Sequence, residues 1–300
     1  KEFYSNSKHA TQEEFQGAFK NELESWQSMK AFELVEKEII PRDANVITSH
    51  TICKWKDKGT PHQKLKARIV PHGNKDYLKN EQRTDSPSIK PEVMKLIISF
   101  AVEHGYDLCC ADIKTAFLHT EGINRDIYVV PPSEIRWTTI ADKYWKLLKT
   151  MYGLVDGPII WFAYAQGILA DYGIQFSAVD KTFGIHIGTD GNIDLVVGMQ
   201  VDDFIYTGTN EAIKLFETFL DEHFIVGKIS KKCFSFFGVK IIQNEDCSVV
   251  MSQEDDLLGI QAIPISNIRA KQSREKVTEM EKKKYQSLIG SLLWIGTHTV

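Results

Sequence analysis

The sequence predicts an α+β protein in which an antiparallel β-sheet is backed by helices. In several segments apolar residues recur at helical spacing, and between them lie short segments with the character of strands. Gly, Pro and Asp-Gly sequences between these strands favour tight turns. The chain has 300 residues, 43% of them hydrophobic and 25% charged, which is enough for about two globular domains.

The first helix is predicted over residues 12–29, because Thr11 and Glu14 form a capping box and apolar residues then follow at helical spacing. The strand-like sequences NVITSHTICKW and KLKARIV come next. A Gly/Pro turn at residues 57–63 separates them, so this region predicts a basic hairpin.

The middle of the chain predicts a second helix that opens at Pro91 and ends at Gly105. DLCCADI then reads as a buried strand with Asp112 near its end. IYVVPP is a strand stopped by two prolines, and IIWFAYAQGILADYG is helical.

The C-terminal half predicts further strands and two helices. TFGIHIGTDGNIDLVVGMQVDDFIYTG reads as three strands joined by an Asp-Gly turn and a VDD turn. Thr209 or Asn210 caps the next helix. FSFFGVKIIQ and SVVMSQ predict another β pair, and MEKKKYQSLIGSLLWIG predicts a closing helix.

The charge distribution is uneven. The net charge of −4 argues against a protein that coats nucleic acid with uniform positive charge. Residues 54–75 are nevertheless basic, opposed only by Asp57, and form either a solvated loop or a surface that contacts phosphates. The basic residues there are Lys54, Lys56, Lys58, His62, Lys64, Lys66, Arg68, His72 and Lys75.

Other features of the composition indicate a soluble intracellular protein. The five cysteines are odd in number and form no C-x-x-C pair, which favours reduced thiols. No apolar stretch approaches the ~20 residues that span a bilayer, and the N-terminus is not a signal peptide. The chain starts without Met and stops within an apolar-patterned segment, so we expect a fragment of a longer polypeptide.

Asp202 and Asp203 lie in an apolar run, where an unpaired buried carboxylate costs several kcal/mol. They are either solvated turn residues or ligands. Asp112 ends another apolar strand, and adjacent strands ~4.8 Å apart can place it opposite Asp202. Three such acids suit two divalent cations in nucleotidyl transfer, and the cations offset a repulsion that would otherwise raise one pKa.

Several sequences, taken in order, carry a resemblance to a known family. KARIVPHG, CADIKTAFLHT, IYVVPP, LLKTMYGLVDGPIIWF, VDDFIYTG and FFGVKI resemble the reverse transcriptase of copia-type retrotransposon polyproteins, over nearly the whole chain. The resemblance implies a right-hand polymerase. Its parts would be fingers at 1–90 and 121–155, palm at 91–120 and 156–240, and the start of a truncated thumb or connection at 241–300.

The resemblance also implies a catalytic and metal-binding triad of Asp112, Asp202 and Asp203. Asp112 and Asp202 would contact the metals most directly, with the backbone carbonyl of Ile113 as a further ligand. The implied cofactor is a pair of Mg²⁺ ions, with Mn²⁺ as an alternative.

The family's substrate contacts are implied at other positions. Lys66 and Arg68 would neutralise the incoming triphosphate, and Asp156 lies in the turn that approaches the nucleotide. Phe117 would be the gate that excludes a ribose 2′-hydroxyl, or alternatively a core aromatic. The segment that grips the primer terminus matches Phe236, Phe237 and Gly238.

The sequence departs from the family pattern at four places. Gln200 replaces an aromatic, and Val155 to Pro158 replace Lys-Gln-Ala-Pro, so Asp156 would bring a negative charge toward nucleotide and template. The tryptophan of an early SKWVF sequence is missing from SHTICKW, and HTV replaces RPD after the final helix.

The implied function is template-directed DNA synthesis. Its partners would be an RNA or DNA template with a primer and deoxynucleoside triphosphates, without a membrane, in the element's cytoplasmic virus-like particle or in the nucleus. One alternative is a decayed or domesticated element that folds and binds nucleic acid without polymerising. Another is an α+β protein with an incidental acidic turn. The oligomeric state is not predicted.

Overall fold

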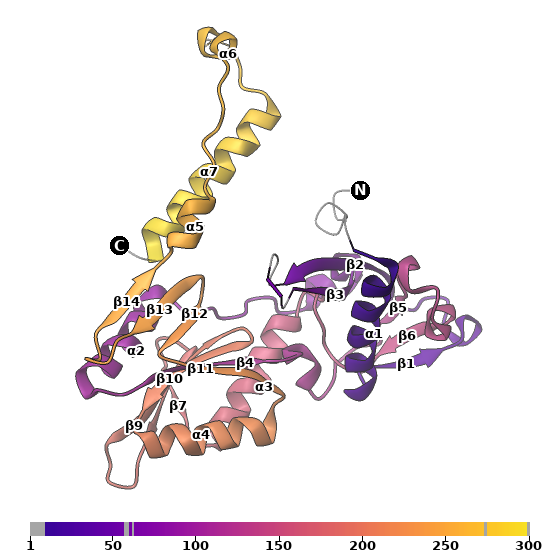
Figure 1. Cartoon of the computed structure of the whole chain (residues 1–300). Coiled ribbons are helices and arrows are strands. Elements are labelled where there is room, and N and C mark those ends of the chain that lie inside the picture. The colour runs from indigo at the N-terminus through magenta and orange to yellow at the C-terminus, as the bar shows by residue number, and fades with distance from the viewer. Residues whose placement is uncertain (1–9, 57–59, 62, 273–274, 299–300) are drawn as a thin grey trace. The chain divides into compact units, whose positions relative to one another are not determined.

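The computed structural model describes residues 10–56, 60–61, 63–272 and 275–298 (Figure 1). Lys58, His62 and most of the turn expected over 57–63 lie outside these residues. The chain forms two compact units. Unit 1 comprises residues 1–87, 113–172 and 223–225, and unit 2 comprises residues 88–112, 173–222 and 226–300.

Unit 1 contains a five-stranded sheet with the strand order β1-β6-β5-β2-β3. The main elements of unit 1 are α1 (Gln12–Ser28), α3 (Gly157–Asp171), β1 (Phe32–Val35), β2 (Val46–Lys56), β3 (Lys64–Pro71), β5 (Tyr128–Val130) and β6 (Tyr144–Leu147). Short 3-10 helices connect them: η1 (Lys37–Ile39), η2 (Gly73–Lys75), η3 (Lys79–Glu81), η4 (Ala116–His119), η5 (Ser133–Ile135) and η6 (Thr139–Asp142).

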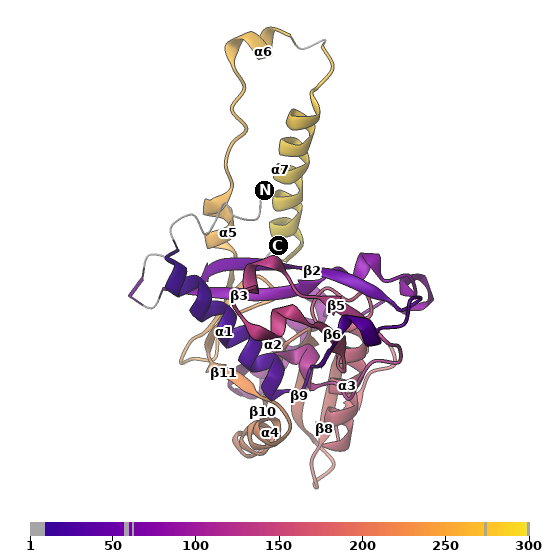
Figure 2. The same ribbon diagram turned by 90° about the vertical axis from the view of Figure 1, so that its right-hand side faces the viewer.

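The expected capping box starts α1. The Thr11 hydroxyl accepts a hydrogen bond from the Glu14 backbone N–H at 3.2 Å, and the Glu14 carboxylate accepts one from the Thr11 N–H at 2.8 Å. Two of the N–H groups that a helix start leaves without partners are thereby satisfied. The helix then packs on β3 (Figure 2).

The expected basic hairpin is the antiparallel pair β2 and β3. Its register places like charges opposite one another, because Lys54 pairs with Lys66 and Lys56 with Lys64. Such pairs are unfavourable in isolation. Side chains alternate along a strand, so the face opposite the buried residues of these strands gathers cations. We call it the basic face: Lys54, Lys56, Lys64, Lys66 and Arg68.

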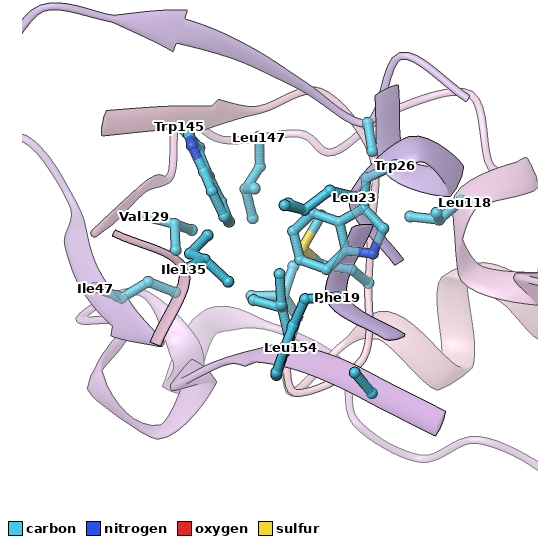
Figure 3. Packing of buried hydrophobic residues seen from close by; sticks show 14 of the residues in the cluster. Phe19, Leu23, Trp26, Ile47, Leu118, Val129, Ile135, Trp145, Leu147 and Leu154 are labelled. Atoms are coloured by element: carbon cyan, nitrogen blue, oxygen red, sulfur yellow. The ribbon is translucent and has the colours of Figure 1, made fainter. Parts of the chain in front are cut away.

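Aliphatic side chains form most of the core of unit 1, and two tryptophans and a phenylalanine lie among them (Figure 3). Trp145 on β6 is 0% exposed, stacks on Phe32 at 4.9 Å and meets Trp26 of α1 edge-on at 5.7 Å. Its indole N–H donates to the Ile140 carbonyl at 2.9 Å, so its polar atom is satisfied. The contact between Trp26 and Trp145 therefore helps to fix α1 to the sheet.

Unit 2 contains a six-stranded sheet with the order β11-β4-β10-β9-β8-β7 and a three-stranded sheet with the order β12-β13-β14. Its helices are α2 (Pro91–His104), α4 (Asn210–His223), α5 (Glu254–Gly259), α6 (Asn267–Lys271) and α7 (Glu279–His298). Its strands are β4 (Leu108–Ile113), β7 (Gln175–Phe176), β8 (Phe183–Ile187), β9 (Ile193–Gln200), β10 (Asp203–Gly208), β11 (Val226–Lys231), β12 (Cys233–Phe236), β13 (Val239–Gln243) and β14 (Val249–Ser252).

One hydrophobic core joins the two sheets of unit 2. Ile97 of α2, Ile205 of β10 and Phe236 of β12 belong to the same buried cluster. The β12–β13 hairpin is consequently held against the same helix that backs the central strands. Helix α7 runs beside the extended segment between α5 and α6 (Figures 1 and 2).

The expected α+β class is confirmed, and so are the helices predicted at 12–29, after Pro91 and after Thr209. One expected turn is corrected. The predicted VDD turn contains only Val201 and Asp202, because Asp203 already belongs to β10 and pairs with Gln200. Among the described residues, no helix is both long and apolar enough to cross a membrane.

Replacing Trp145 with Ala is expected to destabilise unit 1 by about 3–5 kcal/mol, since the change leaves a large cavity in the core. Urea unfolding followed by tryptophan fluorescence measures the effect. Trp137→Ala is the control, because Trp137 is 45% exposed. Equal losses in the two variants would contradict this description of the core.

Candidate active site

Two of the three predicted catalytic acids lie directly opposite each other in unit 2. In the antiparallel pair of β4 and β10, Asp112 is the register partner of Asp203. The expectation that Asp112 faces Asp202 is therefore wrong by one residue. The physical reason is the two-residue turn, which leaves Asp202 at the tip and starts β10 at Asp203.

The turn that carries Asp202 has an unusual backbone. Val201 has a φ of 49°, in the left-handed region that β-branched residues rarely occupy. Such a conformation costs on the order of 1–3 kcal/mol and persists only where the surroundings hold it. Here the register on both sides of the turn holds it, because Gln200 pairs with Asp203 and Met199 with Phe204.

The environment of Asp203 makes its charged form unfavourable. Burial, and after it the nearby charges of Asp202 and Asp112, raise the pKa of Asp203 to about 7. The neighbouring acids thus add to a rise in the pKa of Asp203 that burial causes first. A bound cation would stabilise the ionised carboxylate and reverse this effect.

The carboxylate oxygens of these acids are suitable ligands for divalent cations, but the side chains do not form a complete coordination site by themselves. In the described part of the chain, no group of three or more His, Cys, Asp or Glu side chains converges closely enough to hold an ion. Mg²⁺ usually keeps several waters and takes one or two carboxylates together with substrate phosphates. Asp112, which is exposed, and Asp202, which is half-buried, can serve as such partial ligands. Ile113, the expected carbonyl ligand, follows Asp112 as the last residue of β4.

In unit 1 the structure brings two of the predicted nucleotide-binding residues to one aromatic ring. The Arg68 guanidinium lies 4.5 Å from the centre of the Tyr152 ring, a cation–π contact. Tyr152 meets Phe117 edge-on with ring centres 4.4 Å apart. Lys66 is an exposed residue of the basic face, two positions from Arg68.

Phe117 is 4% exposed. It lies in η4, between the ring of Tyr152 and the start of α3, where a Cβ on Gly157 would lie 3.5 Å from its ring. This burial accommodates both expected roles, the core aromatic and the gate whose edge meets the sugar. The gate role stays a prediction.

Asp156 does not present a negative charge to solvent, contrary to the expectation from its position. It is 3% exposed, and both of its oxygens accept hydrogen bonds from the Arg125 guanidinium, at 2.5 and 3.0 Å. Arg125 also donates to Asp76, which in turn accepts a bond from Asn45 at 2.8 Å. The carboxylate of Asp156 is therefore neutralised inside unit 1 by a buried ion pair, and its nucleotide-binding role stays a prediction.

This ion-pair cluster stabilises the charged form of Arg125. Burial alone would lower the pKa of the guanidinium, but the hydrogen bonds and charges of Asp156 and Asp76 outweigh it and raise the pKa. Ion pairs this deeply buried are strongly destabilising when only one partner is removed. The cluster thus ties the start of α3 to the loops around residues 76 and 125.

Gln200, another departure from the family pattern, has defined structural partners. Its side-chain oxygen accepts hydrogen bonds from the Ser88 hydroxyl at 2.9 Å and from the Ile89 backbone N–H at 3.0 Å. An aromatic side chain without a hydroxyl, such as Phe, has no oxygen that could accept these bonds. Gln200 consequently fastens the end of β9 to the segment that leads into α2.

The predicted primer-grip residues form a tight hairpin in unit 2. Phe236 pairs with Val239, which leaves Phe237 and Gly238 as a two-residue turn between β12 and β13. Phe236 is 1% exposed and belongs to the core of the unit. The turn itself contacts Trp294 near the end of α7.

The structure adds residues that the sequence did not indicate. Arg125, Tyr152 and Trp294 each contact a predicted site residue. Only Tyr152 carried a signal, because it precedes the Gly of the YGL sequence that contributed to the resemblance. Partners such as Arg125 and Asp156 are distant in the chain, and no local pattern links them.

The family is identified by comparison with known proteins. Residues 29–261 match the family described as reverse transcriptase (RNA-dependent DNA polymerase). The chain belongs to this family. The expected copia-type resemblance and the expected right-hand polymerase fold class are thereby confirmed.

Two curated relatives are Pol polyproteins. The chain is 24% identical over 215 residues to the retrovirus-related Pol polyprotein from transposon TNT 1-94 of Nicotiana tabacum, a match that covers 68% of this chain and 15% of that protein. It is 26% identical over 247 residues to the retrovirus-related Pol polyprotein from transposon RE1 of Arabidopsis thaliana, with 78% and 16% covered. The chain therefore spans about a sixth of the length of these relatives.

Among solved structures, a foamy viral protease-reverse transcriptase in complex with double-stranded DNA aligns with a TM-score of 0.49 and 12% identity. The alignment covers 94% of this chain and 40% of that chain.

Folding stability is expected to depend on pH through Asp203. Because folding raises the pKa of this acid to about 7, the folded state holds the proton more tightly than the unfolded chain does. This contribution is present at low pH and is lost as the pH rises from about 4, the unfolded value, to about 7. Asp203→Asn should therefore flatten the stability profile in this range and be more stable than the wild type above it.

Urea unfolding at a series of pH values without divalent cations tests the role of Asp203. Asp190→Asn is the control, because Asp190 lies in the exposed turn before β9, at the end of that strand opposite to Asp202 and Asp203. A variant Asp203→Asn with the same pH slope as the wild type would show that folding does not raise the pKa of Asp203.

Asp156→Gln is expected to destabilise unit 1 by about 2–4 kcal/mol, because Arg125 loses a buried bidentate partner. The matched control is Asp126→Asn, which removes an ion pair to Lys146 from an aspartate that is 66% exposed and should cost under about 1 kcal/mol. Chemical unfolding measures both. If Asp156→Gln were as stable as the control, the Arg125 cluster would not be a structural anchor.

Proposed function

We propose that this domain adds deoxynucleotides to a primer paired with an RNA or DNA template. The observation that carries the proposal is the β4–β10 pairing, which sets Asp112 opposite Asp203 with Asp202 at the adjoining turn, in a chain of the reverse transcriptase family. The raised pKa of Asp203 supports it, since crowded acids that resist ionisation are typical of sites that bind cations.

The proposed cofactor is a pair of Mg²⁺ ions, with Mn²⁺ able to substitute. When bound, these ions would activate the primer 3′-hydroxyl and neutralise charge on the triphosphate. Asp112 and Asp202 are the proposed direct ligands, joined by the carbonyl of Ile113, while Asp203 supports the site from β10. The carboxylates therefore position the reacting groups and accept cations, and no covalent step on the protein is required.

The basic face is the proposed phosphate-contacting surface. Lys54, Lys56, Lys64 and Lys66 oppose one another in pairs across the hairpin, so an anionic ligand would relieve an unfavourable arrangement. The guanidinium of Arg68 lies over the ring of Tyr152, and the same ring contacts Phe117. We assign Lys66 and Arg68 to the triphosphate and Phe117 to the sugar.

The subdomain assignments belong to the same proposal. The fingers would lie in unit 1, and the central palm strands β4, β9 and β10, the primer grip and the start of the thumb in unit 2. The boundary of the two units falls between Asp112 and Ile113. The protein would work in the element's virus-like particle or in the nucleus.

A second function, nucleic-acid binding without polymerisation, was suggested by Gln200 and Asp156. Both residues have structural partners within their own units, so neither departure by itself favours a loss of activity. The two functions differ in one result. The polymerase extends a primer, whereas the binding protein only retains it.

Asp202→Asn is expected to lower Mg²⁺-dependent primer extension on a polyribonucleotide template by about 100-fold or more, because a charge-stabilising group is lost from the reaction centre. Asp190→Asn, in the exposed turn at the opposite end of β9, is the matched control and should retain activity. Product lengths on a denaturing gel give the rates.

Two results would count against the proposal. Extension that survives Asp202→Asn would refute the assignment of the metal ligands. An unmutated chain that binds primer-template but never extends it would favour the non-polymerising alternative.

A further inference from the structure

The hairpin that carries the predicted primer grip ends in a strained turn. Phe237 has a φ of 49° and Gly238 a φ of 72°, two consecutive left-handed residues. Two-residue turns of this kind normally use Asn-Gly or Gly-Gly. A phenylalanine in this conformation costs on the order of 1–3 kcal/mol and persists only where the surroundings hold it.

Residues at the end of α7 contact this hairpin turn and hold its conformation. The Phe237 ring lies 5.4 Å from the Trp294 ring and 4.9 Å from the His298 ring, measured between centres. Trp294 and His298 themselves lie 3.9 Å apart. His298 is 5% exposed, and its Nδ1 lies 2.7 Å from the Trp294 carbonyl oxygen. We call these three rings, Phe237, Trp294 and His298, the aromatic clamp.

The second turn residue is equally confined. A Cβ on Gly238 would lie 2.9 Å from the Trp294 ring, closer than real Cβ atoms approach other heavy atoms. Gly238 therefore meets two requirements at once, a positive φ and the close approach of an indole. Both residues of the turn therefore lie against Trp294.

The base of the hairpin is fixed by a different residue. Gln243, at the end of β13 and 6% exposed, accepts a hydrogen bond from the Leu108 backbone N–H and donates one to the Tyr106 carbonyl, both at 2.8 Å. Leu108 begins β4, the strand that ends at Asp112. The hairpin is thus anchored at its base to a catalytic strand and at its tip to α7.

We propose that Trp294 is a positioning residue for the primer terminus. This inference rests on the proposed polymerase function and extends it. Trp294 does not touch substrate. It fixes the Phe237–Gly238 turn, and the turn presents the primer end to the acids. Aromatic pairs of this kind contribute ~0.5–1.5 kcal/mol each beyond their burial, which is comparable to the strain of the turn.

The test uses two perturbations of the same contact and two controls. Trp294→Ala removes the indole, and Gly238→Ala forces the turn away from it. Trp294→Phe retains a ring. Leu293→Ala changes the neighbouring residue of the same helix, which is 62% exposed. Anisotropy of a fluorescent primer-template without nucleotides gives its Kd, and extension assays give the KM for deoxynucleotide. Circular dichroism confirms that each variant is folded.

Trp294→Ala and Gly238→Ala are each expected to raise the Kd for primer-template about tenfold, as the loss of about two aromatic contacts predicts. Trp294→Phe should recover most of the affinity, and Leu293→Ala should match the wild type. The KM for deoxynucleotide should stay the same in all four, because the nucleotide residues are assigned to other elements.

Three results would overturn the inference. In the first, Trp294→Ala and Gly238→Ala both bind primer-template as tightly as the wild type, even if they are less stable. Trp294 would then have only a structural role. In the second, the KM for deoxynucleotide changes while the Kd does not. In either case a wild type that extends primers leaves the proposed function intact. In the third, the wild type itself fails to bind primer-template, and the proposed function then fails as well.

Discussion

The pairing of β4 with β10 is the constraint on which the rest of the site depends. It places Asp112 opposite Asp203, and the two-residue turn adds Asp202 at the tip. Like charges repel, so the electrostatic interaction among these acids does not favour this arrangement. The register is imposed by the buried apolar residues on either side, Ala111 and Phe204 being 0% exposed. Packing energy from the core thus maintains an electrostatically unfavourable site that a divalent cation would stabilise.

Two of the four departures from the family pattern are accommodated within the fold. Asp156 is enclosed by Arg125, and Gln200 accepts two hydrogen bonds at the start of unit 2. In both cases a polar group that looked misplaced in the sequence forms hydrogen bonds that an apolar replacement could not form. The residues of a site and the residues that hold its loops are therefore hard to separate by comparing motifs alone.

Periodicity and turn chemistry predicted most of the elements, including α1, α2, α4 and the β2–β3 and β9–β10 hairpins. The edge strand β11 and the short β1 and β6 were not predicted, because they lack a clear alternation and owe their state to neighbouring strands. The acids were found because they interrupt apolar runs. Their register was misjudged by one residue, since the sequence does not show whether the turn holds two residues or three. Arg125 and Trp294 depend on contacts across long stretches of chain, which no local pattern reveals.

The crowding of Asp112, Asp202 and Asp203 is the feature that a divalent cation would stabilise. Carbon-13 NMR of labelled aspartate, with Asp203 assigned by its Asn variant, measures the pKa of this acid directly. We expect a pKa of about 7 for Asp203 without divalent ions and a fall of at least about one unit when Mg²⁺ saturates the site. A pKa near the ordinary value of about 4 without metal, or a raised pKa that Mg²⁺ leaves unchanged, would contradict it.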